Sequence, residues 1–589
     1  MSAPFRITRL NFNGGESVDT GDADVIVLVG PNNTGKSRTL VELQQWLSLE
    51  HYVEPPANAF FVLDEPGVEQ LLDGSQTRDW LLERRYSWVN DHDHVARFRT
   101  INSGEQTVES VAHSWPPAER SSRLGSLGSH LVRGLWCGER LQHLGAPNRL
   151  DHDGHPDHPV HWLVRDKALL QAFDSAIWTA FGMHVIVDAW GTSILLRVSR
   201  NQTQSDFVGT SEDGLPDADL VRRLRQLPTL ESQSDGVRSF AGMVLTLLTA
   251  QFPTVLLDEP EAFLHPPQAR LLGRSLAEFQ RDGQLLVATH SLDVLLGLVE
   301  SRPEKVLIVR LTRDGERTSC RTLPPDQLAG LWRDPLLRFS RALDGLFHDG
   351  VVVCEGDTDS QFYSAIAARA DPDATPTPGR HVMFTYAGSK HRIPLIVRAL
   401  RALDVPVRAA VDFDILSSES ELRTLVEATG SGMTGEMSSD LKLVNSHIRG
   451  GAVAPKVGPV ADAIEEALSG SRGRELDASD VRGIRQIIEP PTGWRDAKRR
   501  GLAAVPPAEA TVAAKRLLAT LRAAGIFVVP SGEVESFVPE VGGKGPRWVV
   551  QVVEEGHLDA ADEATKFVGE ILASIPNGRS EIDHEQPSR

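Results

Sequence analysis

The sequence predicts an α/β protein in which two parallel β-sheets follow one another along the chain, and three observations support this. An apolar run at residues 25–29 leads directly into a glycine-rich loop and a helix, as in a βα unit. A second short apolar run, at residues 255–257, ends abruptly in two acids, as a buried parallel strand does at the carboxyl edge of its sheet. Residues 351–411 then alternate strand and helix, an order that demands a parallel sheet with right-handed crossovers.

The loop after the first strand carries a phosphate-binding pattern. Residues 30–37 read GPNNTGKS, which matches G-x-x-x-x-G-K-[ST] between a strand and the helix expected at 37–49. The glycines let backbone N–H groups wrap phosphates, the lysine reaches the terminal phosphates, and the serine offers its hydroxyl to Mg²⁺. We therefore expect nucleotide to be bound by Gly30, Asn32, Asn33, Thr34, Gly35, Lys36 and Ser37.

The acids at the end of the second strand complement this loop. Asp258 can hold Mg²⁺ through water, and Glu259 can take a proton from an attacking water. A further strand, expected at 285–289, ends in His290, which could hydrogen-bond a γ-phosphate. A solvated acidic turn and a satisfied core histidine are the structural alternatives for these residues when each is taken alone.

Upstream, the segment 232–236 reads SQSDG and precedes a strongly apolar helix expected at 237–250. Its free N–H groups and the positive end of the helix dipole would lie just before the acidic strand, with Ser234 or Asp235 as the helix cap.

The order GPNNTGKS, SQSDG, VLLDEPEAFLHP and ATHS resembles the ABC-type ATPase head of the overcoming-lysogenization-defect (OLD) and SMC-like ATPases. The resemblance implies that Ser234 and Gly236 of one protomer complete the ATP site of another, so that nucleotide drives pairing of the heads. The signature here is SQSDG, whereas transporters of the ABC class carry LSGGQ.

Composition bounds the class of protein. The chain has 589 residues, enough for three to four domain-sized units, and its 41% hydrophobic and 24% charged residues are ordinary for a soluble protein. Three scattered cysteines favour neither a disulfide framework nor a zinc site, and no apolar run approaches a membrane span, so we expect a cytoplasmic protein without a membrane contact. A net charge of −19 argues against indiscriminate coating of nucleic acid, although local basic patches remain compatible with it.

Between the phosphate loop and the acidic strand we expect an insertion at about 50–225 with helical pieces at 68–83 and 166–181 and strands at 94–100, 184–189 and 193–198. Residues 151–161, DHDGHPDHPVH, are dense in histidine and aspartate. A metal site is conceivable there, but the glycine and prolines favour a polar loop. The basic residues Arg222, Arg223 and Arg225 are expected on a solvated helix face, with contact to DNA phosphates as the alternative.

The second alternating region carries acids at each strand end. The strand at 351–354 is followed by Glu355 and, one helical turn on, by Asp359; a strand at 381–386 follows, and the strand at 407–411 ends in Asp412 and Asp414. Parallel strands deliver these turns to one edge, and carboxylates that close together call for Mg²⁺ or Mn²⁺ between them. Such a cluster can activate water and stabilise charge on a phosphodiester.

The set EGDTD, AGSK and DFD resembles a Toprim domain, the metal-dependent fold of topoisomerases, primases and OLD nucleases. A strand expected at 525–530 leads into SGEVESFVPEVGGKG, which resembles the third OLD nuclease motif. The resemblance implies Glu535, or alternatively Glu533, as a further metal ligand and Lys544 as a phosphate or leaving-group contact. Between these motifs, Trp494 beside the basic run 495–500 could contact nucleic acid, or could be a solvated helix end.

The predicted organisation is an ATPase head at 1–345, a Toprim nuclease domain at 346–575 with a helical insert at about 415–521, and a disordered tail at 576–589. The resemblance implies an ATP-regulated, metal-dependent endonuclease that uses ATP and Mg²⁺ or Mn²⁺, acts on DNA rather than RNA, pairs through its heads as a dimer or higher oligomer, and serves anti-phage defence with or without a partner defence protein. The alternatives are an ATPase sensor or scaffold that does not cut, and a ribonuclease acting on tRNA.

Overall fold

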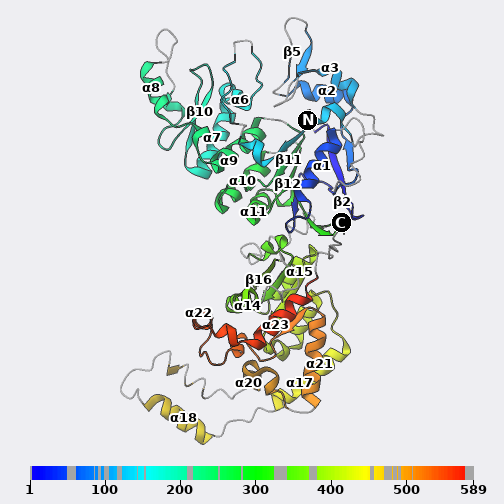
Figure 1. Cartoon of the computed structure of the whole chain (residues 1–589), viewed down its shortest axis with the longest axis vertical. Coiled ribbons are helices and arrows are strands. Elements are labelled where there is room, and N and C mark those ends of the chain that lie inside the picture. Colours follow the sequence, from blue (N-terminus) through cyan, green and yellow to red (C-terminus); the bar gives the residue numbers. More distant parts are fainter. Residues whose placement is uncertain are drawn as a thin grey trace, which may run out of the picture. The chain divides into compact units, whose positions relative to one another are not determined.

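The computed structural model describes most of the chain. The described residues are 3–48, 61–84, 87–89, 94–98, 105–115, 123–141, 144–150, 154–207, 217–249, 252–279, 283–323, 341–369, 381–450, 457–469, 480–481, 484, 487, 493–506 and 509–576. They fall into two compact units, one made of the residues up to 323 and the other of residues 341–576 (Figure 1). The tail beyond Pro576 and most of the Gly/Ser-rich part of the second insert lie outside the described residues. No helix within the described ranges is long and apolar enough to cross a membrane.

A six-stranded sheet forms the centre of the first unit, in the order β14-β13-β3-β12-β11-β8. The five neighbouring strands from β13 to β8 run parallel to one another. Strand β14 lies at one edge of the sheet and forms an antiparallel hairpin with β13. Strand β3 (Val25–Val29) is buried at every position, as its unbroken apolar sequence predicts. The other strands are β8 (Val132–Leu135), β11 (Thr254–Asp258), β12 (Gln284–Ala288), β13 (Val306–Asp314) and β14 (Arg317–Leu323).

A smaller antiparallel sheet, ordered β2-β1-β4, packs beside the central one. Strands β1 (Phe5–Asn11) and β2 (Ser17–Asp19) pair with each other, and β1 also pairs with β4 (Gly67–Gln70). The Gln284 side chain ties the two sheets together, because it accepts from the Ile7 N–H at 2.7 Å and donates to the Ile7 carbonyl at 2.9 Å. The helix expected from residue 68 is therefore wrong at its start: residues 67–70 are a strand, and helix α2 (Gly74–Leu82) begins only after the Asp73 cap.

Helices α1 (Lys36–Ser48), α9 (Asp235–Thr249), α10 (Pro266–Phe279) and α11 (Leu292–Ser301) follow the loops that matter for function. Helices α10 and α11 approach very closely because glycines lie at their crossing. A Cβ atom on Gly297 would come within 2.1 Å of the Arg270 carbonyl oxygen, and one on Gly273 within 2.4 Å of the Val294 carbonyl oxygen. This crossing fixes the helix that starts just after β12, and with it the loop at its beginning.

The segment between α1 and α9 is mixed, as the sequence predicts, but it also supplies strand β8 to the central sheet. It also supplies β4 to the sheet β2-β1-β4, and the antiparallel pair β9–β10 and the three-stranded sheet β5-β6-β7 account for its other strands. Its elements are β5 (Ser87–Val89), β6 (Ala96–Phe98), β7 (Gln106–Thr107), α3 (Val108–Ser114), α4 (Gly128–Leu131), α5 (Cys137–Arg140), α6 (Pro159–Arg165), α7 (Lys167–Phe181), β9 (His184–Asp188), β10 (Leu195–Ser199) and α8 (Ala218–Gln226).

The second unit is built on a four-stranded, wholly parallel sheet with the order β16-β15-β17-β18. Its strands are β15 (Gly350–Cys354), β16 (Val382–Tyr386), β17 (Val407–Val411) and β18 (Ile526–Val528). The predicted order of strands and helices is confirmed, and all the strand exits lie on one edge of the sheet. Because β18 pairs with β17, the turn after residue 528 reaches the same edge as Asp412.

Helices cover the sheet of the second unit, and aromatic residues fill the core on one side of it. Phe362 and Tyr363 of α14 pack with Phe527, Trp548 and Phe567 in one buried cluster. The helices are α14 (Asp357–Arg369), α15 (Ile393–Ala402), α16 (Glu419–Ala428), α17 (Gly435–Gly450), α18 (Val457–Ser469), α20 (Gly493–Arg500), α21 (Glu509–Ala523), α22 (Pro546–Glu554) and α23 (Asp562–Ser574).

Candidate functional site

The phosphate loop of the first unit connects β3 to α1, and its lysine donates hydrogen bonds to backbone carbonyls of the same loop. Lys36 is only 4% exposed, and its Nζ atom donates hydrogen bonds to the carbonyl oxygens of Gly30 at 2.8 Å and Pro31 at 2.7 Å. Burial lowers the pKa of Lys36 to about 8, against the attraction of Glu259, which raises it. A buried ammonium whose partners are neutral carbonyls is well placed to take an anionic phosphate instead.

Glycine is required at both ends of this loop. Gly30 has φ +138° and Gly35 φ +98°, and a Cβ atom on Gly30 would approach the Leu311 carbonyl oxygen to 2.3 Å. Asn33 also has a positive φ of 65°, the exposed Asn32 lies beside it, and the Thr34 hydroxyl donates to the Pro31 carbonyl at 3.0 Å.

Asp258 ends β11 beside the start of α1. Burial raises the pKa of Asp258, while a hydrogen bond with Ser37 and the nearby charges of Arg140 and Lys36 lower it. Its Oδ1 atom is buried and accepts no hydrogen bond within the described part of the chain. A serine hydroxyl and a carboxylate with an unused oxygen fit the oxygen ligands that Mg²⁺ takes in a nucleotide site.

Glu259 follows in a strained conformation that two neighbours hold in place. Its φ is +44°, its N–H donates to the Ala288 carbonyl at 2.8 Å, and its own carbonyl accepts two hydrogen bonds from Arg140, both at 3.1 Å. The Glu259 Oε1 atom lies 3.9 Å from His290 Nε2. Burial lowers the pKa of His290 to about 4, and the charge of Lys36 contributes, so the imidazole is neutral near pH 7.

Two residues of this site were missed by sequence reasoning. Glu261 is a buried carboxylate that accepts the His290 N–H at 2.6 Å and the Thr289 hydroxyl at 2.8 Å. The third acid of the DEPE run was the signal for it. Arg140 is fully buried and sits more than a hundred positions before Glu259, so no local pattern points to it.

Ser234 and Gly236 lie at the start of α9. Ser234 is exposed, and its carbonyl accepts the Arg238 N–H at 3.0 Å. A Cβ atom on Gly236 would come within 2.4 Å of the carbonyl oxygen of Phe263, a residue with φ +71° in the loop after the acidic strand. The signature glycine thus lets this loop approach α9, and the contribution of Ser234 and Gly236 to a partner's ATP site stays a prediction.

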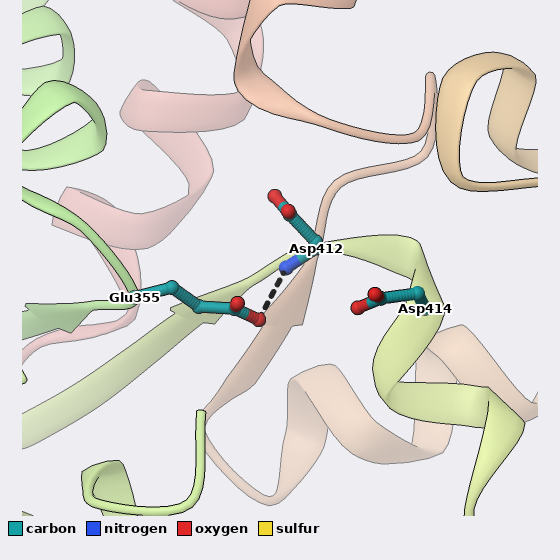
Figure 2. A group of neighbouring side chains, drawn as sticks. All are labelled: Glu355, Asp412 and Asp414. Carbon is teal, nitrogen blue, oxygen red and sulfur yellow. Dashed lines mark hydrogen bonds between the residues drawn. The ribbon is translucent and has the colours of Figure 1, made fainter. Parts of the chain in front are cut away.

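In the second unit, the ends of β15 and β17 bring three acids together. One carboxylate oxygen each from Glu355, Asp412 and Asp414 lies within 4.8 Å of the other two, and this is the metal-sized group found among the described residues. Figure 2 shows the Glu355 side chain reaching across to the backbone of Asp412, whose N–H it accepts at 3.1 Å. The third carboxylate, of Asp414, points into the same space (Figure 2).

These carboxylates are hard to ionise together without a cation. Burial raises the pKa of Glu355, and the charge of Asp414 adds to it; burial and then Glu355 raise the pKa of Asp412. The Oδ1 atom of Asp414 is buried and accepts no hydrogen bond from any described residue. An unsatisfied carboxylate oxygen in such a group fits Mg²⁺ or Mn²⁺.

A lysine already neutralises part of this charge. The Nζ atom of Lys498 lies 3.0 Å from Asp412 Oδ2 and 3.2 Å from Asp414 Oδ2. Lys390 of the AGSK motif lies 3.8 Å from Asp414 Oδ1 and 3.1 Å from Glu421 Oε2.

The run that begins at Trp494 lies on helix α20, and its contact with nucleic acid stays a prediction. Trp494 is partly buried, and its indole N–H donates to Asn445 at 3.1 Å, so it anchors helix α20. Within the basic run, Lys498 is the residue whose ammonium pairs with Asp412 and Asp414.

The remaining predicted ligands form a neighbouring group. Asp359 accepts the Gly356 N–H at 2.9 Å, and burial together with the charge of Glu535 raises its pKa to about 6. Glu533 is 5% exposed and forms an ion pair with Lys544, whereas Glu535 accepts only a long hydrogen bond, 3.4 Å, from the Gly545 N–H. Glu535 is therefore the freer of the two glutamates for a metal ion.

The histidine-rich segment has a structural role where it is described. His158 caps helix α6 by accepting the Val160 N–H at 3.2 Å. The two ring nitrogens of His161 are used by the His158 N–H at 3.2 Å and the Asn148 carbonyl at 2.9 Å. Residues 151–153 of the segment lie outside the described residues.

The basic face of helix α8 is exposed, with Arg222 and Arg223 paired to Asp219, as a solvated face would be.

Comparison with known families matches both units. Residues 193–297 match a family described as "AAA domain, putative AbiEii toxin, Type IV TA system". Residues 346–414 match "Overcoming lysogenization defect protein-like, TOPRIM domain". A curated relative, the Old nuclease of Escherichia phage P2, is 24% identical over 198 residues, which are 30% of this chain and 33% of the relative. The matched region thus spans about a third of that nuclease's length.

Among solved structures, the SMC head bound to the C-winged helix domain of ScpA is 11% identical, with a TM-score of 0.33, over 55% of this chain and 99% of that chain. The SMC head domain from Thermotoga maritima is 14% identical, with a TM-score of 0.28, over 54% and 99% of the two chains.

Proposed function

We propose, from the premise that this chain is an ATPase–Toprim fusion of the OLD family, that it is an ATP-regulated, divalent-metal-dependent endonuclease that cleaves nucleic-acid phosphodiesters. The observation that carries the proposal is the meeting of Glu355, Asp412 and Asp414 at one sheet edge, with an Asp414 oxygen left without a hydrogen bond. Carboxylates gathered in a partly buried space repel one another unless cations lie between them, and the lysines beside this group leave the Asp414 Oδ1 atom without a hydrogen bond.

In this proposal the two units divide the chemistry. Lys36 would hold the nucleotide phosphates, and Ser37 and Asp258 would hold Mg²⁺, the aspartate through water. Glu259 would take a proton from an attacking water, and His290 would hydrogen-bond the γ-phosphate. In the second unit, Glu355, Asp412 and Asp414, with Asp359 and Glu535 beside them, would hold divalent ions. Such ions supply an activated water and neutralise the charge that develops on the phosphodiester. Lys544 would contact the phosphate or the leaving group.

The proposal extends to DNA as the substrate, to pairing of the ATPase heads through Ser234 and Gly236, and to a role in defence against phage, with or without a partner protein. The support for these finer statements is the family resemblance and the relative's description as a nuclease of phage P2.

One observation favours a second function. Because Lys498 already pairs with two of the three acids, the cluster is partly neutralised without metal, as it would be in a sensor ATPase that does not cut. The test must therefore separate cutting from ATP hydrolysis.

The experiment compares the full chain with its Glu355→Gln variant. Glutamine keeps the acceptor for the Asp412 N–H but removes the charge, so the fold is preserved. We expect the wild type to cleave plasmid, single-stranded DNA or tRNA with Mg²⁺ or Mn²⁺, and Glu355→Gln to lose at least about a hundredfold in cleavage while its ATP hydrolysis is unchanged. Glu554→Gln, an exposed change on α22, is the matched control.

Two results would overturn the assignment. Cleavage by Glu355→Gln at the wild-type rate would remove the acids from the chemistry, and a wild type that cuts none of the three substrates would favour the sensor. The preferred substrate among the three decides between DNA and RNA. Lys36→Met tests the proposed regulation by ATP, because this variant should lose ATP binding and any response of cleavage to ATP.

A further inference from the structure

We propose that Lys498 is a metal-competing positioning residue: its ammonium pairs with Asp412 and Asp414 when no divalent ion is bound, and it opposes the binding of an ion to the same acids. The inference rests on the proposed metal-dependent function and deepens it by naming a built-in competitor at the same site. It predicts that this chain binds divalent ions more weakly than its acids alone would.

The contact is direct and two-sided. The Nζ atom lies 3.0 Å from Asp412 Oδ2 and 3.2 Å from Asp414 Oδ2, and its hydrogen-bond geometry with Asp414 is good. The two aspartate side chains are 14% and 22% exposed, so water screens this pair only weakly. A lysine bridging two ligands of one metal group occupies oxygens that the ion would use.

Helix α20 is anchored so firmly that the position of Lys498 is built into the fold. Ala497 is fully buried, and the Trp494 indole N–H is bonded to Asn445. Just after the helix, the Leu502 N–H donates to the Pro530 carbonyl at 2.9 Å. The helix therefore cannot slide along the sheet edge without breaking these contacts.

The backbone of Lys498 also contacts the turn after β18, which in turn holds the segment between the two aspartates. A Cβ atom on Gly532 would come within 2.3 Å of the Lys498 carbonyl oxygen, and the Gly532 carbonyl accepts the N–H of Phe413 at 2.7 Å. Phe413 is the residue between the two aspartates. The lysine and its carboxylates are thus held by one shared glycine.

The side chain itself is free to withdraw. It is 36% exposed, and a lysine ammonium on a flexible stem can move several ångströms while its backbone stays fixed. A divalent ion and an ammonium cannot share the same two oxygens, because like charges at that separation repel strongly. An ion that binds through these Oδ2 atoms therefore displaces the lysine, and an ion that binds through the opposite oxygens, such as Asp414 Oδ1, still meets the repulsion of its charge. In both cases the lysine weakens the measured affinity.

The test measures the affinity of the full chain for Mn²⁺ without other ligands. Electron paramagnetic resonance gives the concentration of unbound Mn²⁺ in each titration. We expect Lys498→Met to bind Mn²⁺ about tenfold more tightly than the wild type, because the competitor is gone. Lys498→Arg, which keeps the charge, should stay near the wild type. Arg499→Met removes a charge from the exposed neighbouring position on the same helix and should leave the affinity unchanged.

The same comparison in a variant with an impaired acidic group shows whether the change in Mn²⁺ affinity arises at that group. In the Glu355→Gln background the gain from Lys498→Met should vanish, which separates the Toprim acids from Mn²⁺ bound elsewhere. Unchanged or weaker Mn²⁺ binding by Lys498→Met would overturn the inference, and Lys498→Gln serves as a second variant should the methionine protein fail to fold.

The outcome is separable from that of the proposed function. A wild type that cuts, combined with unaltered Mn²⁺ affinity in Lys498→Met, refutes only the role of Lys498. Absence of cutting by every variant, combined with tighter Mn²⁺ binding by Lys498→Met, refutes the nuclease and leaves the competition standing.

Discussion

The carboxylate of Glu261 accepts the backbone N–H of His290 at 2.6 Å. This bond links the turn after the acidic strand β11 to the turn after β12, so that the imidazole and the acids at the ends of two neighbouring strands are held as one piece. Burial raises the pKa of Glu261, while the bonds from His290 and Thr289 lower it. Glu261 thus supports the proposed ATP site by holding the His290 backbone in place.

Glu261→Gln should slow ATP hydrolysis about tenfold. The glutamine amide group cannot accept the bond that Thr289 donates, and the oxygen that remains carries no charge for the His290 N–H. Both contacts therefore weaken, and His290 is less well oriented. The measurement is the steady-state rate of ATP hydrolysis by the full chain. Glu304→Gln, on an exposed turn of the same unit, should hydrolyse ATP at the wild-type rate.

Arg140→Met should destabilise the first unit by about 2–4 kcal/mol. The buried guanidinium donates twice to the Glu259 carbonyl and once to Met243 sulfur at 3.3 Å, and no water can replace it in that position. Chemical denaturation of the full chain checks this, followed by a fluorescence or circular-dichroism signal. The exposed Arg225→Met change is the control, and equal stability of the two variants would contradict the structural role assigned to Arg140.

Gly236→Ala should disturb the loop that carries Phe263. Its added methyl group would lie 2.4 Å from the Phe263 carbonyl oxygen, so either the loop or the start of α9 must shift, at a cost of about 1–3 kcal/mol. We expect lower thermal stability together with slower ATP hydrolysis. Gly191→Ala meets only an ordinary contact at 3.5 Å and should change neither quantity.

The stabilisation that Mg²⁺ gives the second unit should grow with pH. Burial raises the pKa values of Glu355, Asp412 and Asp359, the last to about 6. From about pH 4 up to these raised pKa values, the metal-free fold therefore binds more protons than the unfolded chain. Its free energy of unfolding therefore falls as pH rises through that window, and protons compete with the ion at the low end.

The measurement is the shift of Tm on adding Mg²⁺ at about pH 5.5 and at about pH 8. We expect the larger shift at the higher pH, and a smaller shift at both for Glu355→Gln. A shift of equal size at the two pH values would mean that the raised carboxyl groups are not the ones that bind the ion.

Local signals in the sequence were enough for most of the strands and for the loops at their ends. The runs at residues 25–29 and 407–411 are short, apolar and bounded by turn residues, and such segments fold the same way in any parallel sheet. The strand at 67–70 was taken for a helix start because its pairing partner is β1, some sixty residues earlier, and its own sequence does not alternate.

Side chains that act across long loops were the hardest to predict. Arg140 meets Glu259 only because the central sheet brings β8 and β11 together. Lys498 had a readable signal, because Trp494, Ala497 and Lys498 share one helix face at spacings of three and four, which makes that face the inner one. The charge of the run pointed to solvent instead.

The pairing of β17 with β18 spans the chain from Val411 to Ile526, with the whole second insert between them. A ribosome therefore delivers Glu355, Asp412 and Asp414 more than eighty codons before Lys498, and the turn with Glu533 and Glu535 later still. The nascent polypeptide therefore carries these three acids for a stretch of its synthesis before Lys498, Glu533 and Glu535 exist. The order of translation thus makes the complete acidic group one of the last parts of this unit that a newly made molecule can assemble.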